Sequence, residues 1–258
     1  MRILFICLLL AFSTSTFALG QTGHRITGAI AERHINQHTK SAIEKILGSD
    51  TLTEVTNYAD EMRTDPSDFW QHQARHYHYV TVPKGKKYSD EGVPKQGDAV
   101  FALDKYSKVI LNPKSIKSEK QLALKFIVHI IGDLHQPLHV GSGEDRGGNN
   151  VKLKFFRKDT NLHRIWDTGL IKQKHLSYSE WTNWLDREIT TNDIKQWRSI
   201  DPLVWINENV KIRDSIYPKS DSISFRYLYK NMPIMRLRLK QAGIRMAFFL
   251  DELFKKQN

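Results

Sequence analysis

The chemistry of this chain is concentrated in two short segments, each with a histidine four residues before an aspartate. The first pair, His129 and Asp133, lies in the run Val-His-Ile-Ile-Gly-Asp-Leu-His-Gln-Pro-Leu-His, which ends at His139, and the second pair is His163 and Asp167. At helical pitch this spacing places both side chains of a pair on one face, one turn apart. Neutral imidazole and carboxylate are ligands of zinc sites that keep an open position for chemistry. The repeated pair therefore predicts a metal centre, with His139 as a further ligand.

Three other segments offer side chains of the same kinds. His24 lies near the start of the first expected helix, and Asp60 is expected on a short helix. His78 lies in His-Tyr-His-Tyr-Val, where an extended backbone would point His76 and His78 to the same side. The resulting pool of five histidines and three aspartates is too large for one tetrahedral zinc and sufficient for two or three ions that share a carboxylate. Asp133, in the middle of the densest motif, is the natural bridge.

Each assignment has a simpler alternative. His24 could be a surface residue at a helix start, Asp60 could pair with Arg63 across one turn, and Asp167 could cap a helix. His135 fits the orientation of a ligand carboxylate better than direct ligation. Four further histidines are expected to be ordinary surface or core residues: His34, His38, His72 and His175.

Hydrophobic periodicity predicts an all-α domain with a small β-hairpin near the metal motifs. Helices are expected from near His24, up to Gly48, over residues 118–135, and after Pro233. Residues 82–98, rich in proline, glycine and lysine, predict a surface loop. Alternating apolar and lysine side chains over 151–156, after the turn residues Gly-Gly-Asn, predict one arm of the hairpin.

Charge and composition limit the classes of protein to which this chain can belong. The 258 residues carry a formal net charge of +11, which favours a polyanionic partner such as nucleic acid or an anionic membrane, or serves solubility alone. Residues 1–18 have the pattern of a secretory signal peptide, with Arg2 before a short apolar stretch, and they contain the only cysteine, Cys7. The expected mature chain is one domain over 19–258 that begins at Leu19, is secreted or periplasmic, bacterial in origin, and acts as a monomer without a membrane anchor.

The motifs follow one another in a specific order: Gly-His, Ala-Asp-x-x-Arg, His-Tyr-Val, His-x-x-Gly-Asp-x-His-Gln-Pro-Leu-His, Gly-Gly-Asn and His-x-x-Trp-Asp-Thr-Gly. This set resembles the trinuclear-zinc single-strand-specific nuclease and 3′-nucleotidase family first known from fungi and plants. That family shares its helical fold with the bacterial zinc-dependent phospholipases C. The motifs extend from residue 19 to about residue 170, and the C-terminal third resembles the family only in being helical.

The resemblance implies three Zn²⁺ ions, whose ligands are carried over residue by residue. One ion would be held by Asp60, His78, His129 and Asp133, and a second by His139, His163 and Asp167. The third would be held by His24, Asp133 and the α-amino group and carbonyl of Leu19. This last pair of ligands exists only after signal cleavage, and the family normally has Trp where this chain has Leu19.

The resemblance also implies an activity. The chain is expected to hydrolyse single-stranded DNA and RNA and 3′-nucleotides through a metal-activated hydroxide, leaving 5′-phosphate ends. Arg63 matches an arginine that stabilises the transition state, with a salt bridge as its simpler role, and Asn149 is expected near the phosphate. Thr81 stands where fungal members have an aspartate that assists the water.

The motifs say less about the residues that contact the substrate than about the metal ligands, and they leave other functions open. Strand-binding candidates, each equally consistent with a solvated basic surface, are Lys84, Lys86, Lys87, Tyr88, Lys152 and Lys154. The alternatives are a zinc-dependent phospholipase C on the same metal core, or a secreted zinc-binding protein without catalysis. The residue pattern does not define base preference or pH optimum.

Overall fold

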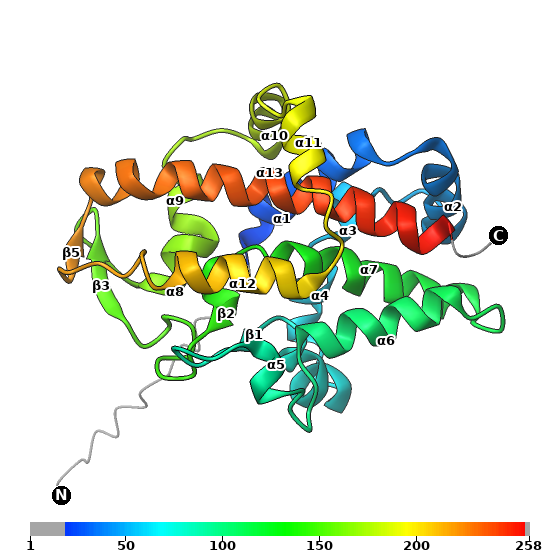
Figure 1. Cartoon of the computed structure of the whole chain (residues 1–258), viewed down its shortest axis with the longest axis horizontal. Helices are drawn as coiled ribbons and strands as arrows, with labels where there is room; N and C mark the ends of the chain where they lie inside the picture. Colours follow the sequence, from blue (N-terminus) through cyan, green and yellow to red (C-terminus); the bar gives the residue numbers. More distant parts are fainter. Residues whose placement is uncertain (1–18, 256–258) are drawn as a thin grey trace, which may run out of the picture.

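The computed structural model describes residues 19–255, which form a mainly helical domain with a few short strands (Figure 1). The predicted all-α class with a small β-hairpin is confirmed. The predicted signal peptide, residues 1–18, lies outside the described residues. The helices are α1 (Gly20–His34), α2 (Gln37–Leu47), α3 (Leu52–Val55), α4 (Tyr58–Glu61), α5 (Tyr88–Glu91), α6 (Ala99–Leu111), α7 (Lys117–Asp133), α8 (Leu162–Arg164), α9 (Leu170–Lys172), α10 (Tyr178–Asp186), α11 (Thr191–Gln196), α12 (Pro202–Arg213) and α13 (Phe225–Lys255).

Helices α1 and α13 form the central contact of the fold, and α6 packs along α7 on the other side (Figure 1). The crossing of α1 and α13 is close because Gly243 carries no side chain: a Cβ there would lie 2.5 Å from Cβ of Ile30. Two apolar clusters result. One surrounds α6 and α7, and the other gathers α8, α9, α10 and the start of α13 around Trp166 and Trp181.

Several helix boundaries agree with the sequence pattern. The helix predicted over 118–135 is α7, and the helix predicted to end at Gly48 is α2, whose N-terminus is capped by Asn36 accepting from the Thr39 amide. The first helix begins at Gly20, four residues before the predicted start at His24. Within residues 82–98, predicted to be a surface loop, the short helix α5 forms, which the sequence pattern did not predict.

The prediction that the closing helix begins after Pro233 is wrong, because α13 starts at Phe225 and contains that proline. Proline removes one hydrogen bond and crowds the preceding turn, at a cost of about 3 kcal/mol. Met232 and Met235, on either side of it, are buried in the second apolar cluster, so their packing outweighs the break.

Two small sheets fix loops near the metal motifs. Strands β1 (Val80–Thr81) and β2 (Val140–Gly141) pair in parallel over two residues each. The fully buried Arg213 of α12 holds both strand ends, since its Nη1 donates to the carbonyls of Val82 (2.7 Å) and Val140 (2.9 Å). This pairing brings the segments after His78 and His139 side by side.

The predicted hairpin is confirmed as β3 (Lys152–Phe155) paired antiparallel with β4 (Lys158–Asn161). A third strand, β5 (Ser222–Ile223), joins β3 in parallel, which the local pattern did not predict. Its two residues precede α13, so the start of that helix lies beside the hairpin (Figure 1).

A partly buried ion-pair group joins α12 to α13. Both oxygens of Glu208 accept from Arg245 (2.6 and 2.7 Å), and one also accepts from Arg238 (2.6 Å). The two arginines are only 2% exposed. Burial alone would raise the pKa of Glu208, but the two guanidinium groups hold it below its usual value.

Within residues 19–255, no helix combines the length and apolarity that crossing a membrane requires.

Candidate metal centre

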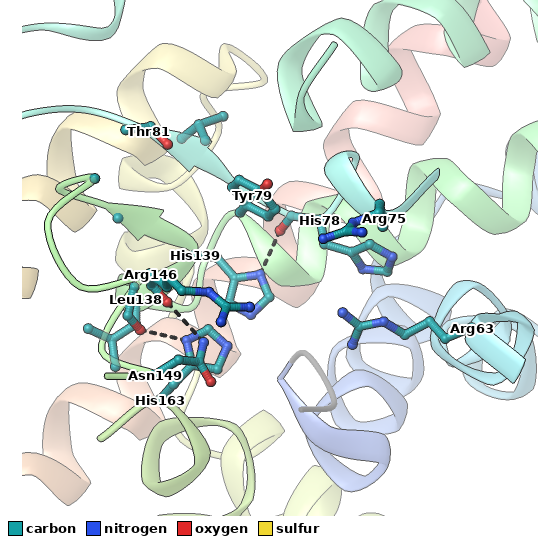
Figure 2. A pocket seen from close by; sticks show the side chains of 14 residues that line it. Arg63, Arg75, His78, Tyr79, Thr81, Leu138, His139, Arg146, Asn149 and His163 are labelled. Atoms are coloured by element: carbon teal, nitrogen blue, oxygen red, sulfur yellow. Dashed lines mark hydrogen bonds between the residues drawn. The ribbon is translucent and has the colours of Figure 1, made fainter. Parts of the chain in front are cut away.

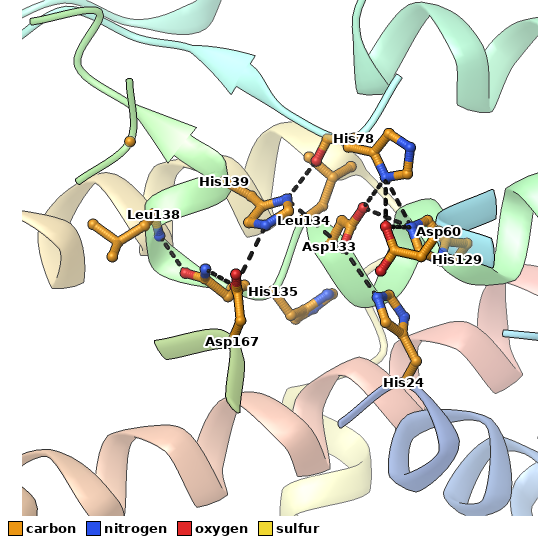
Figure 3. Close-up of polar contacts among 12 residues, drawn as sticks. His24, Asp60, His78, His129, Asp133, Leu134, His135, Leu138, His139 and Asp167 are labelled. Atoms are coloured by element: carbon orange, nitrogen blue, oxygen red, sulfur yellow. Dashed lines mark hydrogen bonds and ion pairs between the residues drawn. The ribbon is translucent and has the colours of Figure 1, made fainter. Parts of the chain in front are cut away.

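Eight histidine and aspartate side chains from six separate segments meet in the interior of the domain, and all of them except His163 are labelled in Figure 3. They form three groups, two of which share His129, and within each group the possible ligand atoms lie within 4.8 Å of one another. The groups are His24 with His129 and Asp133, Asp60 with His78 and His129, and His139 with His163 and Asp167. Every side chain predicted as a metal ligand therefore lies in one buried cluster, and all are 8% exposed or less.

Asp133 lies at the centre of this cluster (Figure 3). Its Oδ2 is 3.0 Å from Nδ1 of His78 and 3.0 Å from Nε2 of His129. Its Oδ1 faces the other way, 3.3 Å from Nε2 of His24 and 3.7 Å from Nδ1 of His139. A carboxylate whose two oxygens face different sets of imidazoles has the geometry of a bridging ligand.

Main-chain carbonyls fix the orientation of three imidazole rings. Because a carbonyl only accepts, each bonded Nδ1 carries the proton and Nε2 is left to face the cluster. The bonds run from His129 to Thr56 (2.6 Å), from His139 to His78 (2.6 Å) and from His163 to Gly147 (2.7 Å). The turn Gly147-Gly148-Asn149 thus positions an imidazole as well as leading into the hairpin.

Gln136, which the motif pattern did not single out, orients one of the carboxylates. Its amide nitrogen donates to Oδ1 of Asp167 (2.7 Å), and its amide oxygen accepts from the Leu138 amide (2.5 Å). The expectation that His135 orients a ligand carboxylate is wrong. Its Nδ1 donates to the carbonyl of Ile131 (2.7 Å) and its Nε2 faces Arg245 (3.3 Å), on the far side of the helix end.

Asp167 lies in a π-helical turn, Ile165–Gly169, between α8 and α9. Turns of this kind frequently occur at functional sites. The carboxylate Oδ2 still lies 3.3 Å from Nε2 of His163, so the pair predicted from helical spacing meets despite the irregular turn.

Burial and mutual charge shift the pKa values of the cluster. Burial lowers the pKa of His24 to about 4 and that of His78 to about 3, which keeps both rings neutral at physiological pH. Burial raises the pKa of Asp60 to about 6. Burial alone would lower the pKa of His139, yet the charges of Asp133 and Asp167 raise it to about 9. Asp133 itself has its pKa held well below the usual value by the charges of its imidazole neighbours, against the effect of burial.

An open cleft of about 340 Å³ leads to the cluster, and His78, His139 and His163 lie in its wall (Figure 2). Arg63 lines the cleft and reaches back to Asp60, with 3.4 Å between Nη1 and Oδ1. Its position is compatible with both of its predicted roles, the contact with a phosphate and the salt bridge.

Other predicted residues also lie in the cleft wall. Asn149 lines it, and its amide nitrogen donates to the carbonyl of Arg146 (2.9 Å). Thr81 also lines the cleft (Figure 2). Arg75 and Arg146 add two guanidinium groups that the sequence motifs did not indicate (Figure 2). The cleft therefore combines metal-binding side chains with a positively charged wall suited to a phosphoester.

The residues predicted to bind a strand are only partly suitable. Tyr88 is 7% exposed and its hydroxyl donates to Asp98 (2.8 Å), so the prediction of a stacking role is wrong. Lys84 is paired with Glu144 (2.9 Å) and Lys154 with Asp159 (2.6 Å). Lys86, Lys87 and Lys152 are exposed but do not line the cleft.

The remaining histidines lie outside the cluster. His76 belongs to a short helical turn instead of the extended segment considered above, and its ring contacts the Tyr79 hydroxyl (3.1 Å). His34 pairs with Asp186 (2.8 Å), as expected of an ordinary surface histidine.

Leu19 is the N-cap residue of α1, directly before the helix that carries His24. Its side chain is 2% exposed and packs in the second apolar cluster, where Gly23 leaves room for it. Leu19 therefore contributes apolar packing at the start of α1.

A helical domain built around a buried multi-histidine, multi-aspartate cluster at the base of a basic cleft defines a class of protein equipped to hold several metal ions. The family model described as S1/P1 nuclease matches residues 19–255, and the chain belongs to this family. The chain is 28% identical to nuclease S1 of Aspergillus oryzae over 276 residues, covering 94% of each chain. It is 27% identical to endonuclease 2 of Arabidopsis thaliana over 266 residues, covering 91% of this chain and 90% of the relative. A shorter match at 28% identity, over 158 residues, relates it to nuclease P1 of Penicillium citrinum and covers 58% and 57% of the two chains. Family membership supports a nuclease, a hydrolase that acts on nucleic acids.

Proposed function

We propose that this protein is an exported, zinc-dependent nuclease that hydrolyses single-stranded DNA and RNA and removes 3′-phosphates from nucleotides, leaving 5′-phosphate ends. The observation that carries the proposal is the convergence of three potential metal-binding groups at the base of a cleft walled by arginines.

The unsatisfied polar atoms of the cluster support its fit to metal ions. Buried polar atoms without partners are rare, because each one costs free energy. Within the described residues, six such atoms occur in this one cluster: Nδ1 and Nε2 of His24, Oδ2 of Asp60, Oδ1 of Asp133, Nε2 of His139 and Oδ2 of Asp167. Imidazole nitrogens and carboxylate oxygens are the ligand atoms that zinc prefers.

Three Zn²⁺ ions would be held by the groups that the motifs indicate. Asp60, His78, His129 and Asp133 would hold the first, and His139, His163 and Asp167 the second. His24, Asp133 and the α-amino group and carbonyl of Leu19 would hold the third. The last set requires a free amino group at Leu19, so the proposal includes cleavage of the signal peptide after residue 18.

The chemistry that zinc would supply is activation of a water molecule and neutralisation of phosphate charge. The side chains of this chain would bind and orient the substrate. Arg63, next to Asp60, would donate its planar fork of N–H groups to the oxygens of the phosphoryl group as its charge increases. Arg75 and Arg146 would bind neighbouring phosphates, and the Asn149 side chain would lie beside the scissile one.

The decisive experiment measures hydrolysis of single-stranded DNA, RNA, a 3′-mononucleotide and phosphatidylcholine, before and after chelation and zinc restoration. We expect zinc-restorable cleavage of the first three substrates with 5′-phosphate products. Cleavage of phosphatidylcholine alone would support the phospholipase C alternative, and tight zinc binding without turnover would support a zinc-binding protein without catalysis. Either result would overturn the proposal.

Elemental analysis combined with N-terminal sequencing of the mature protein tests the metal assignment separately. We expect three zinc ions per chain and a first residue Leu19. Two ions, or a different first residue, would remove the basis for assigning His24 to a third ion.

A further inference from the structure

The two most exposed large hydrophobic side chains of the described residues lie one turn apart at the start of α13. Phe225 is 75% exposed and Tyr229 is 85% exposed. The spacing of four residues places them on one face of the helix. Exposed aromatic rings carry a cost in solvation, and neighbouring rings on one face form an apolar patch of the kind used in binding.

A row of positive charge runs beside these rings. Arg226 and Lys230 have the same four-residue spacing and are exposed, and like charges at this spacing destabilise a helix. The first turn of α13 contains no acidic residue, and the positive end of the helix dipole adds to the charge. Within residues 19–255, neither side chain is within 4.0 Å of a carboxylate, and Lys230 contacts only the Ser215 carbonyl (3.4 Å). This arrangement favours an anionic ligand.

The neighbouring hairpin contributes a third ring and a further cation. The turn between β3 and β4 consists of Phe156 (φ 51°) and Arg157 (φ 67°), two residues in the left-handed region that such turns usually reserve for asparagine and glycine. The ring of Phe156 meets that of Phe225 edge to face, with centroids 4.7 Å apart. The unfavourable turn thus holds an aromatic ring and an exposed guanidinium beside α13.

A contact connects this region with the segment that forms part of the cleft wall. A hollow of about 660 Å³, lined by Tyr217, Arg226 and Lys230 among others, lies beside the start of α13. The Tyr217 hydroxyl donates to Oδ2 of Asp145 (2.7 Å), and Asp145 directly precedes Arg146 in the cleft wall. One hydrogen bond therefore links the wall of the hollow to the segment that carries Arg146 of the cleft wall.

We propose that Phe156, Arg157, Phe225, Arg226, Tyr229 and Lys230 form a second binding surface for single-stranded nucleic acid, the strand surface, which holds the part of a strand that extends beyond the metal cleft. Aromatic faces stack on unpaired bases and adjacent cations bind the phosphates between them, which is how single strands are held without sequence preference. The inference rests on the proposed function, because it assigns a longer substrate to the same cleft.

The test compares a long substrate with a short one. The intact zinc-loaded protein is assayed on a 20-nucleotide single strand and on a 3′-mononucleotide, for the wild type and for two double variants, Phe225→Ala with Tyr229→Ala and Arg226→Glu with Lys230→Glu. The matched controls are Lys40→Glu with Lys45→Glu, exposed on α2 at the other end of the molecule, and Ile116→Ala, a 63% exposed apolar residue (Figure 1).

We expect each strand-surface variant to raise KM for the 20-nucleotide strand by at least about tenfold and to leave kcat/KM for the mononucleotide unchanged. The charge variant is also expected to weaken the dependence of KM on salt, since fewer cations are displaced from the strand. The controls are expected to match the wild type. Unchanged KM for the long strand, or an equal loss on both substrates, would overturn the strand surface.

Fluorescence anisotropy with a labelled 20-nucleotide strand in a chelating buffer separates this inference from the proposed function. If the wild type hydrolyses nothing but binds the strand, and the variants bind at least about tenfold more weakly, the nuclease proposal fails and the strand surface stands. Sedimentation with phosphatidylserine-containing vesicles tests the other anionic partner. Loss of vesicle binding in the variants without any change in strand binding would overturn the inference in favour of a membrane.

Discussion

Replacement of Gly132 by alanine is expected to remove one metal ion while leaving the fold intact. Gly132 lies on α7 against the imidazole of His24, and a Cβ there would be 2.9 Å from Nδ1 and 3.2 Å from Cε1 of that ring. Ordinary contacts are at least 3.4 Å, so the ring must retreat by about half an ångström. Since His24 already lies 3.3 Å from Asp133, a retreat from α7 lengthens that distance as well.

The effect on global stability is expected to be small because two contributions oppose each other. Alanine is about 1 kcal/mol more favourable than glycine inside a helix. Overpacking a buried position costs about 1–3 kcal/mol. The free energy of unfolding should therefore fall by no more than about 2 kcal/mol. A displacement of half an ångström is at the limit that a metal site tolerates, so we expect affinity for the proposed third zinc to fall at least about tenfold.

Zinc content after dialysis against a weak chelator, measured together with thermal unfolding, tests this expectation. Gly132→Ala should retain two ions, whereas the proposed function implies three in the wild type. Gly169→Ala is the matched control, because a Cβ there meets its nearest atoms at 3.4–3.5 Å, an ordinary contact. Retention of three tightly bound ions by Gly132→Ala would refute the reasoning, as would loss of an ion from the control alone.

Three further predictions concern other parts of the structure. Gln136→Leu should weaken zinc binding at the Asp167 group by about 10–100-fold, measured by chelator competition, because the carboxylate loses the amide that orients it; equal affinity in the variant and the wild type would contradict this role. Glu208→Gln should lower the free energy of unfolding by about 3 kcal/mol in urea denaturation, near the lower end for buried pairs because the side chain is 34% exposed. The same variant should also change how stability depends on pH. Because the pKa of Glu208 is lowered in the folded protein, its contribution to the free energy of unfolding is present above its unfolded pKa and is lost as pH falls through the folded pKa. The wild type should show this loss and the variant should not. For zinc-stripped protein, the His139 pKa of about 9, raised from 6.5, gives stability that is full below pH 6.5 and is lost as pH rises to 9. His139→Gln should remove that decline in Tm between pH 6.5 and 9, and a Tm that falls identically in both proteins would show that other groups cause it.

The sequence alone predicts those parts of the candidate site in which two side chains meet because of their spacing along one helix. The pair His129 and Asp133 lies on a regular helix, so helical pitch predicts that the two side chains meet, and they do. His24, Asp60 and His78 could be named as candidates, but only the fold determines that they reach the same place.

The features of the fold and the site that could not be predicted from the sequence depend on contacts between residues far apart in the chain. Gln136 orients Asp167 across 31 positions, and His163 donates to Gly147 in a loop that no local pattern places there. Pro233 normally ends a helix, yet packing on both sides of it continues α13. Tyr88 looked like an exposed aromatic residue in a polar loop, and its bond to Asp98 explains why it is buried.

The strand pair β1–β2 and the guanidinium of Arg213 have a consequence for the order of events during folding. The proposed metal ligands extend from Leu19 to Asp167, and the segments after His78 and His139 pair with each other and are both held by Arg213 of α12. A partly folded chain offers only helix-local pairs such as His129 and Asp133, too few ligands to retain zinc firmly. Because contacts between distant segments form late, metal uptake should follow the collapse of the whole chain. The C-terminal third contributes no metal ligand. Its docking during folding would nevertheless determine when the protein can bind its metal ions.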